Sequence, residues 1–157
     1  MPMNSEKLRL LLSSRVPPAA LDYCIALWEQ YTFTFKLRKK RITKVGDFSC
    51  RKNQVPTITV NQDSHPYLFV LTYVHEVAHL IVHRNHGWKA EAHGQIWKDI
   101  FRELMVPLLR SDVFPPDLLR ELNRHMVNPK ATSFSDSRLS AMLRKHDERQ
   151  QHVIILD

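Results

Sequence analysis

Cysteine and long apolar runs are both scarce in this chain of 157 residues. The two cysteines, Cys24 and Cys50, stand far apart and outside any CxxC pair, so the sequence predicts reduced thiols instead of a disulfide framework or a zinc ribbon. The most apolar stretch, residues 67–74, is too short to span a membrane. The first ten residues carry three charged side chains and no long apolar region, which is unlike a secretory signal. These absences predict a cytoplasmic protein without a membrane span.

Acidic residues are in the minority, because 23 Lys and Arg side chains outnumber 16 Asp and Glu side chains. The formal net charge of +7 and the pI of about 9.6 are compatible with a polyanionic partner such as DNA. The densest basic segment comprises Lys36, Arg38, Lys39, Lys40, Arg41 and Lys44. These side chains could bind DNA through its phosphates, without sequence preference. The alternative is a solvated strand edge, where lysines oppose aggregation.

The spacing of apolar residues changes along the chain from helical to alternating and back to helical. Helical spacing covers residues 5–31, with a break at Pro17 and Pro18. Alternating spacing predicts strands over residues 33–37, 42–51 and 57–60. Further helices are predicted over residues 66–86, 94–105, 116–125 and 136–149, and the run 152–157 is typical of a strand.

These elements predict the α+β fold class, with a small, mainly antiparallel three-stranded sheet packed on helices. The helix over residues 66–86 should be central, because its apolar residues are too continuous for a surface helix. We assign residues 1–127 to one compact domain. Residues 128–157 are polar, so we expect a peripheral segment there, and its end at Asp157 is compatible with a chain that has been cut short.

Residues 75–79, His-Glu-Val-Ala-His, match the HExxH motif inside this predicted central helix. Positions i and i+4 share one face about 6 Å apart along the axis, so His75 and His79 could bind one zinc ion. Glu76 would lie beside the metal and act as general base. A chance match on a charged helix is the alternative, but burial of these side chains among apolar neighbours would then go uncompensated.

A catalytic zinc site needs a third protein ligand and an open position. The candidates for this ligand are His83, His86, Glu91, His93 and Glu103. His83 continues the same helix, and one straight helix cannot wrap three ligands around an ion. The metzincin pattern also fails, because Val82 and Asn85 stand at the positions of its glycine and its third histidine.

His93 is the favoured third ligand because Gly94 follows it and a new helix begins there. A turn between the two helices could fold His93 back over the first two histidines. Trp97, one helical turn further, could then form a wall of the site. Glu91 stays open as the alternative ligand.

The motif at residues 75–79 and the segment Ala-His-Gly-Gln-Ile-Trp at 92–97 resemble the SprT-like family of zinc metalloproteases, which is related to the Spartan protease domain. Residues 46–48 and 58–61 are similar to strands of that family. The likeness covers residues 15–110 and implies a zincin-like fold, with His93 as third ligand and DNA-associated proteins as substrates. Many family members carry a cysteine-rich zinc ribbon after the protease domain, and this chain has no cysteine there.

The leading hypothesis is therefore a zinc-dependent endopeptidase, monomeric by default, that holds one Zn²⁺ and hydrolyses peptide bonds in protein substrates. A non-catalytic zinc-containing adaptor for nucleic acids or proteins is the alternative, although a purely structural site would not need Glu76. A zinc-dependent ribonuclease of the HxxxHxxxxxH type would require histidine where Asn85 stands. The group that stabilises the transition state beside zinc is unassigned, with Tyr67, Tyr73 and His125 as candidates.

Overall fold

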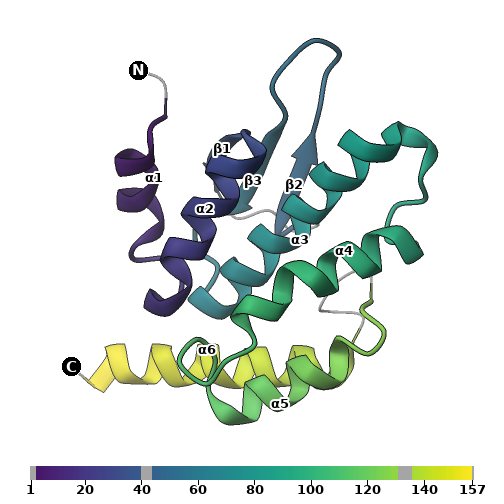
Figure 1. Ribbon diagram of the computed structural model, residues 1–157. Helices are drawn as coiled ribbons and strands as arrows, with labels where there is room; N and C mark the ends of the chain where they lie inside the picture. The colour runs from purple at the N-terminus through teal and green to yellow at the C-terminus, as the bar shows by residue number, and fades with distance from the viewer. Residues whose placement is uncertain (1–2, 40–43, 131–135, 157) are drawn as a thin grey trace.

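The computed structural model describes residues 3–39, 44–130 and 136–156, which form six α-helices and a three-stranded sheet (Figure 1). The helices are α1 (Ser5–Leu12), α2 (Leu21–Tyr31), α3 (Pro66–His86), α4 (Gln95–Met105), α5 (Pro116–His125) and α6 (Ser137–Leu156). The strands are β1 (Thr34–Arg38), β2 (Gly46–Ser49) and β3 (Thr57–Asn61), and three short 3-10 turns are η1 (Pro18–Ala20), η2 (Gly87–Lys89) and η3 (Val106–Leu108). The predicted α+β class is confirmed.

The sheet is mixed, with strand order β1-β3-β2. Strand β3 pairs with β2 in antiparallel register and with β1 in parallel register. The prediction of a mainly antiparallel sheet is therefore wrong for the β1–β3 pair. Alternating apolar residues show which face a strand buries, but they do not show which strand becomes its neighbour. Here β3 inserts between the two strands that precede it in sequence.

Helix α3 is the central element that the sequence predicts. It begins at Pro66, where the Nδ1 atom of His65 accepts a hydrogen bond from the backbone N–H of Leu68 (3.4 Å). It ends where Gly87 adopts a φ of +64°, a conformation that favours glycine. Twelve of its 21 residues are buried, because the helix packs against α2, α4 and the strands β2 and β3.

The last three helices include α5 and α6, which pack on each other. Helix α4 packs on α3, and Figure 1 shows α5 and α6 side by side beneath this pair. The segment after Asn128, which we expected to be polar and peripheral, contributes Leu139 and Leu143 to the hydrophobic core. The terminal run that we expected to be strand-like, residues 152–156, belongs to α6, so that prediction is wrong. An isolated strand has no neighbour to bond its backbone, whereas a helix bonds its own.

Both cysteines are free thiols, as the sequence predicts. Cys24 is fully buried, and desolvation raises the pKa of its thiol to about 12. Cys50 is half-buried. Within residues 3–39, 44–130 and 136–156, no helix combines the length and the apolar character needed to cross a membrane.

Candidate metal centre

Two elements bring three histidines together. Helix α3 presents His75 and His79 one turn apart, with ring centroids 5.0 Å from each other. His93 reaches them from a tight turn in which the backbone N–H of Gly94 donates to the carbonyl oxygen of Glu91 (3.1 Å). His93 itself adopts a φ of +60°, which histidine tolerates better than most residues. A Cβ atom at Gly94 would lie 3.2 Å from the Glu91 carbonyl oxygen, so this compact turn favours glycine.

The ring nitrogens of the three histidines converge on one point. The Nε2 atom of His93 lies 2.8 Å from Nε2 of His79 and 3.1 Å from Nε2 of His75. One Nε2 atom carries either a proton or a lone pair, so it cannot form a good hydrogen bond to both neighbours at once. Tetrahedral zinc, with bonds of about 2.0 to 2.1 Å, would separate its ligand nitrogens by about 3.3 Å. The donor set therefore fits a metal ion better than it fits a hydrogen-bonded cluster.

Burial keeps these imidazoles neutral, which is the form that binds metal. Desolvation lowers the pKa of His75 far below its usual range, and the neighbouring charges of His79 and His93 lower it further. Desolvation and the charge of His93 lower the pKa of His79 to about 4. Desolvation also lowers the pKa of His93. All three side chains are therefore available as ligands at neutral pH.

Trp97 forms the wall that the sequence predicts at this site. The fully buried indole contacts His75, His79 and His93, with ring centroids 4.8, 5.5 and 4.9 Å away. Its Nε1–H donates to the backbone carbonyl oxygen of His75 (3.4 Å). Phe101 stacks on the indole, with ring centroids 4.8 Å apart and an interplanar angle of 10°, and its ring lies 6.0 Å from that of His75. The position of Phe101, four residues after Trp97 on α4, was a signal of this support that we did not use.

Glu76 is buried beside the ligands and does not belong to the histidine group. Its Oε2 atom lies 3.9 Å from Nε2 of His75. Strand β2 begins against the same side chain, because a Cβ atom at Gly46 would lie 3.4 Å from Cγ of Glu76. The same Cβ atom would lie 2.9 Å from the carbonyl oxygen of Thr59. Only glycine allows β2 to approach the carboxylate this closely, and sequence analysis did not anticipate this contact.

The other candidates for the third ligand lie outside the histidine group. The side chains of His86, Glu91 and Glu103 are exposed. His83 packs against Trp88 instead, with ring centroids 4.1 Å apart. The structure therefore places His93, and not Glu91, with His75 and His79.

Comparisons with protein-family models, with curated proteins and with solved structures give no match to this chain. The likeness to the SprT-like family thus stays a prediction from sequence motifs. The geometry of the histidine group supports a metal centre independently of that likeness.

The predicted DNA-binding side chains occupy one end of the sheet, as far as the structure describes them. Lys36, Arg38 and Lys39 are exposed on or just after β1. Lys44 is also exposed and forms an ion pair with Asp47 at 3.6 Å. The remaining two residues of this segment, Lys40 and Arg41, lie outside the described residues.

The three candidates for the stabilising group occupy different places. The hydroxyl group of Tyr73 donates to the carbonyl oxygen of Cys24 (2.8 Å) and is directed into the α2 contact. Tyr67 packs against Phe114 and His146. His125 is buried at the end of α5, close enough to the metal centre for its charge to lower the pKa of His75.

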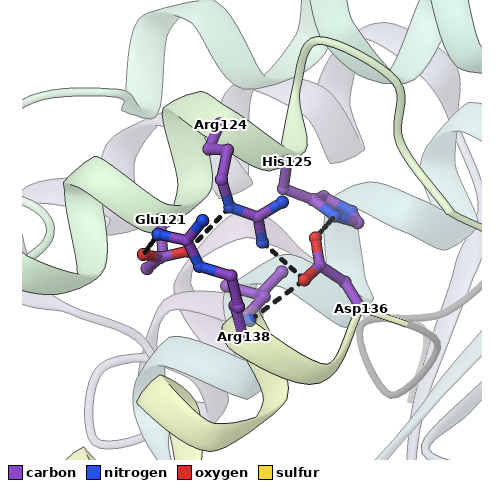
Figure 2. Close-up of polar contacts among 6 residues, drawn as sticks. Glu121, Arg124, His125, Asp136 and Arg138 are labelled. Atoms are coloured by element: carbon purple, nitrogen blue, oxygen red, sulfur yellow. Dashed lines mark hydrogen bonds and ion pairs between the residues drawn. The ribbon is translucent and has the colours of Figure 1, made fainter.

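A polar network with three buried members, Glu121, His125 and Asp136, fixes the orientation of His125 (Figure 2). Its Nδ1 atom lies 2.8 Å from Oδ2 of Asp136, and Oδ1 of the same carboxylate accepts hydrogen bonds from Arg124 and from the backbone N–H of Leu139. Glu121 accepts from Arg124 and from Arg138 in the same network, as Figure 2 shows. An ionised Asp136 accepts a hydrogen bond from the Nδ1–H group of His125 and so orients the imidazole ring.

Proposed function

We propose that this chain is a zinc-dependent endopeptidase with Glu76 as general base. The observation that carries the proposal is the convergence of three neutral imidazole nitrogens beside a buried carboxylate that is not in their group. A purely structural zinc site is closed by four protein ligands, whereas three ligands leave a position for water and substrate. His75, His79 and His93 would hold the ion.

Zinc bound there would supply a Lewis acid that polarises the scissile carbonyl group and lowers the pKa of an attacking water. The carboxylate of Glu76 would accept the proton of that water and deliver it to the leaving amine. Glu76 follows His75 directly in α3 and is confined by Gly46 of β2, so its side chain is held at the edge of the metal centre. Trp97 excludes water from one side of the histidines.

His125 is the best placed of the three candidates to stabilise negative charge on the substrate. Its side chain is buried and Asp136 fixes its orientation through Nδ1, so that with both ring nitrogens protonated the Nε2–H group would be left to donate to that negative charge. The hydroxyl groups of Tyr67 and Tyr73 have no comparable relation to the histidines. We assign His125 this role as part of the proposed peptidase mechanism.

The resemblance to SprT-like proteases suggests substrates that are exposed segments of DNA-associated proteins. The net charge of +7 supports a polyanionic partner. The exposed cations Lys36, Arg38 and Lys39 at the end of the sheet would contribute to that attraction.

The test is substitution of Glu76 by Gln. This variant should keep its fold and its metal but lose peptide hydrolysis by about 100-fold to 10,000-fold, because the amide cannot accept the proton of water. Cleavage of a disordered protein by the zinc-loaded chain and by Glu76→Gln is the measurement, with metal content determined on both samples. Undiminished cleavage by Glu76→Gln would remove Glu76 from the mechanism. Zinc binding without any cleavage by the wild-type chain would favour the adaptor hypothesis.

A further inference from the structure

A second cluster of aromatic side chains lies one helical turn beyond the metal centre. We call Phe48 of β2, His83 of α3 and Trp88 of η2 the aromatic platform. The ring centroid of Trp88 lies 4.1 Å from that of His83 and 6.1 Å from that of Phe48. The ring centroids of His83 and Phe48 are 5.7 Å apart. His83 follows His79 by four residues, so the platform begins about 6 Å further along the α3 axis.

The aromatic platform exposes an indole ring to solvent. The side chain of Trp88 is 69% exposed, whereas Trp97 is fully buried and Trp28 is half-buried with its Nε1–H bonded to the Phe33 carbonyl oxygen. Trp88 is therefore the tryptophan whose ring is open to solvent. The rings of His83 and Phe48 pack against it.

The two segments that build the platform carry cations and no carboxylates. Residues 48–62 and residues 77–90 contain no Asp or Glu. Within them lie four exposed cations, Arg51, Lys52, Arg84 and Lys89. Among the side chains that the structure describes, none forms an ion pair with these four. Figure 1 shows the β2–β3 connection and the C-terminal end of α3 at the same end of the molecule.

We propose that the aromatic platform binds single-stranded nucleic acid, with a base stacked on Trp88 and phosphates beside Arg84 and Lys89. Exposed aromatic rings bordered by cations are the combination that single strands require, because every base offers a π-face and every link carries a negative charge. Duplex bases are already stacked on one another and do not reach an indole. An apolar peptide would use the rings but gain nothing from the unpaired cations. This inference does not depend on peptidase activity.

The experiment is binding of a fluorescently labelled oligothymidylate of about 15 nucleotides, followed by anisotropy across a salt series. Replacing Trp88 by Ala should weaken binding by about 5-fold to 150-fold, the loss of one stacked base, while Trp88→Phe should restore most of it. The matched control is Leu10→Ala, which removes another strongly exposed apolar side chain, 75% accessible, on α1. Oligonucleotide binding should also quench the intrinsic fluorescence of the wild-type chain.

The cations have their own control. Arg84→Ala and Lys89→Ala should each reduce the log–log salt slope by about 0.7, and Arg120→Ala, an exposed arginine on α5, should leave it unchanged. Unchanged affinity in Trp88→Ala would overturn the proposal. A second result would also overturn it: binding that persists in Trp88→Ala but disappears when Lys36, Arg38 and Lys39 are replaced by Ser. The binding site would then be the end of the sheet. Trp88-dependent binding of an aromatic peptide, with no binding of the oligonucleotide, would assign the platform to a peptide instead.

Discussion

At the scale of single residues, burial changes the chemistry of the histidines that α3 and the following turn bring together. An imidazole in water has a pKa near 6.5 and is partly protonated below neutral pH. Desolvation lowers the pKa values of His75, His79 and His93, so they keep their lone pairs in a more acidic medium. The three imidazoles are thus already in the neutral form that binds a cation.

Removal of His93 should abolish stoichiometric metal binding. His93→Asn is the suitable variant, because asparagine tolerates the positive φ of the turn but its amide is too short to replace the imidazole. Zinc affinity is measured by competition with a chelator. It should fall by more than about 10-fold to 100-fold, which is the loss typical when a residue that hydrogen-bonds to a metal ligand is replaced. Glu91→Ala is the control and should retain full affinity. The opposite pattern would make Glu91 the ligand.

Gly46 should be equally intolerant of change, for a steric reason. A methyl group there would collide with Cγ2 of Thr72 and would lie 2.9 Å from the Thr59 carbonyl oxygen, which is held in the sheet. Gly46→Ala should therefore lower the free energy of unfolding by about 1 to 3 kcal/mol. Urea denaturation measures this loss, and Ser49→Ala at the exposed end of β2 is the control. Equal stability of Gly46→Ala and the wild-type chain would show that β2 can move away from Glu76 without cost.

At the scale of elements, a polar network joins α5 to the start of α6. Burial raises the pKa of Asp136, but hydrogen bonds from His125, Arg124 and the Leu139 backbone outweigh this effect and lower it to about 2, from a usual 3.8. Between about pH 2 and pH 3.8, the unfolded chain therefore binds more protons than the folded chain. The stabilisation is complete above about pH 4 and is lost as the pH falls towards 2.

Asp136→Asn tests this contribution. Loss of the carboxylate should lower the free energy of unfolding near neutral pH by about 1 to 3 kcal/mol, because Arg124 and His125 lose a charged acceptor. The difference between variant and wild type should shrink as the pH is lowered to about 3, where the wild-type carboxylate begins to protonate in the unfolded chain. Urea denaturation at several pH values measures both effects. The control is Asp112→Asn, which removes an exposed ion-pair partner of Arg110. A stability difference between Asp136→Asn and the wild-type chain that did not change with pH would contradict the stabilising role of the ionised Asp136.

At the scale of the whole molecule, charge and metal chemistry are distributed unevenly. The two segments that flank the platform carry four cations and no carboxylates, whereas Glu121 and Asp136 are engaged in the network between α5 and α6. The four cations therefore add positive charge to the surface near β2, α3 and η2. The metal centre lies one helical turn from the aromatic platform on α3, so a polyanion attracted there would lie close to the histidines.

Local patterns were sufficient to predict most elements of this fold. Proline and glycine set the limits of α3, and helical spacing marked the apolar faces of α4 and α5. HExxH placed two imidazoles on one helical face, because the period of the α-helix fixes the relation of residues four apart. These features depend on neighbours within a few residues, which the sequence displays directly.

The remaining features depend on contacts between distant segments. Only tertiary structure decided that β3 separates β1 from β2, that His93 and not Glu91 joins the histidines, and that Gly46 lies against Glu76. The same holds for the contact of His125 with Asp136, which involves a segment we expected to be peripheral. The physical reason is that burial is a property of the whole chain. Which segment excludes water from a side chain is settled only when all of them pack together.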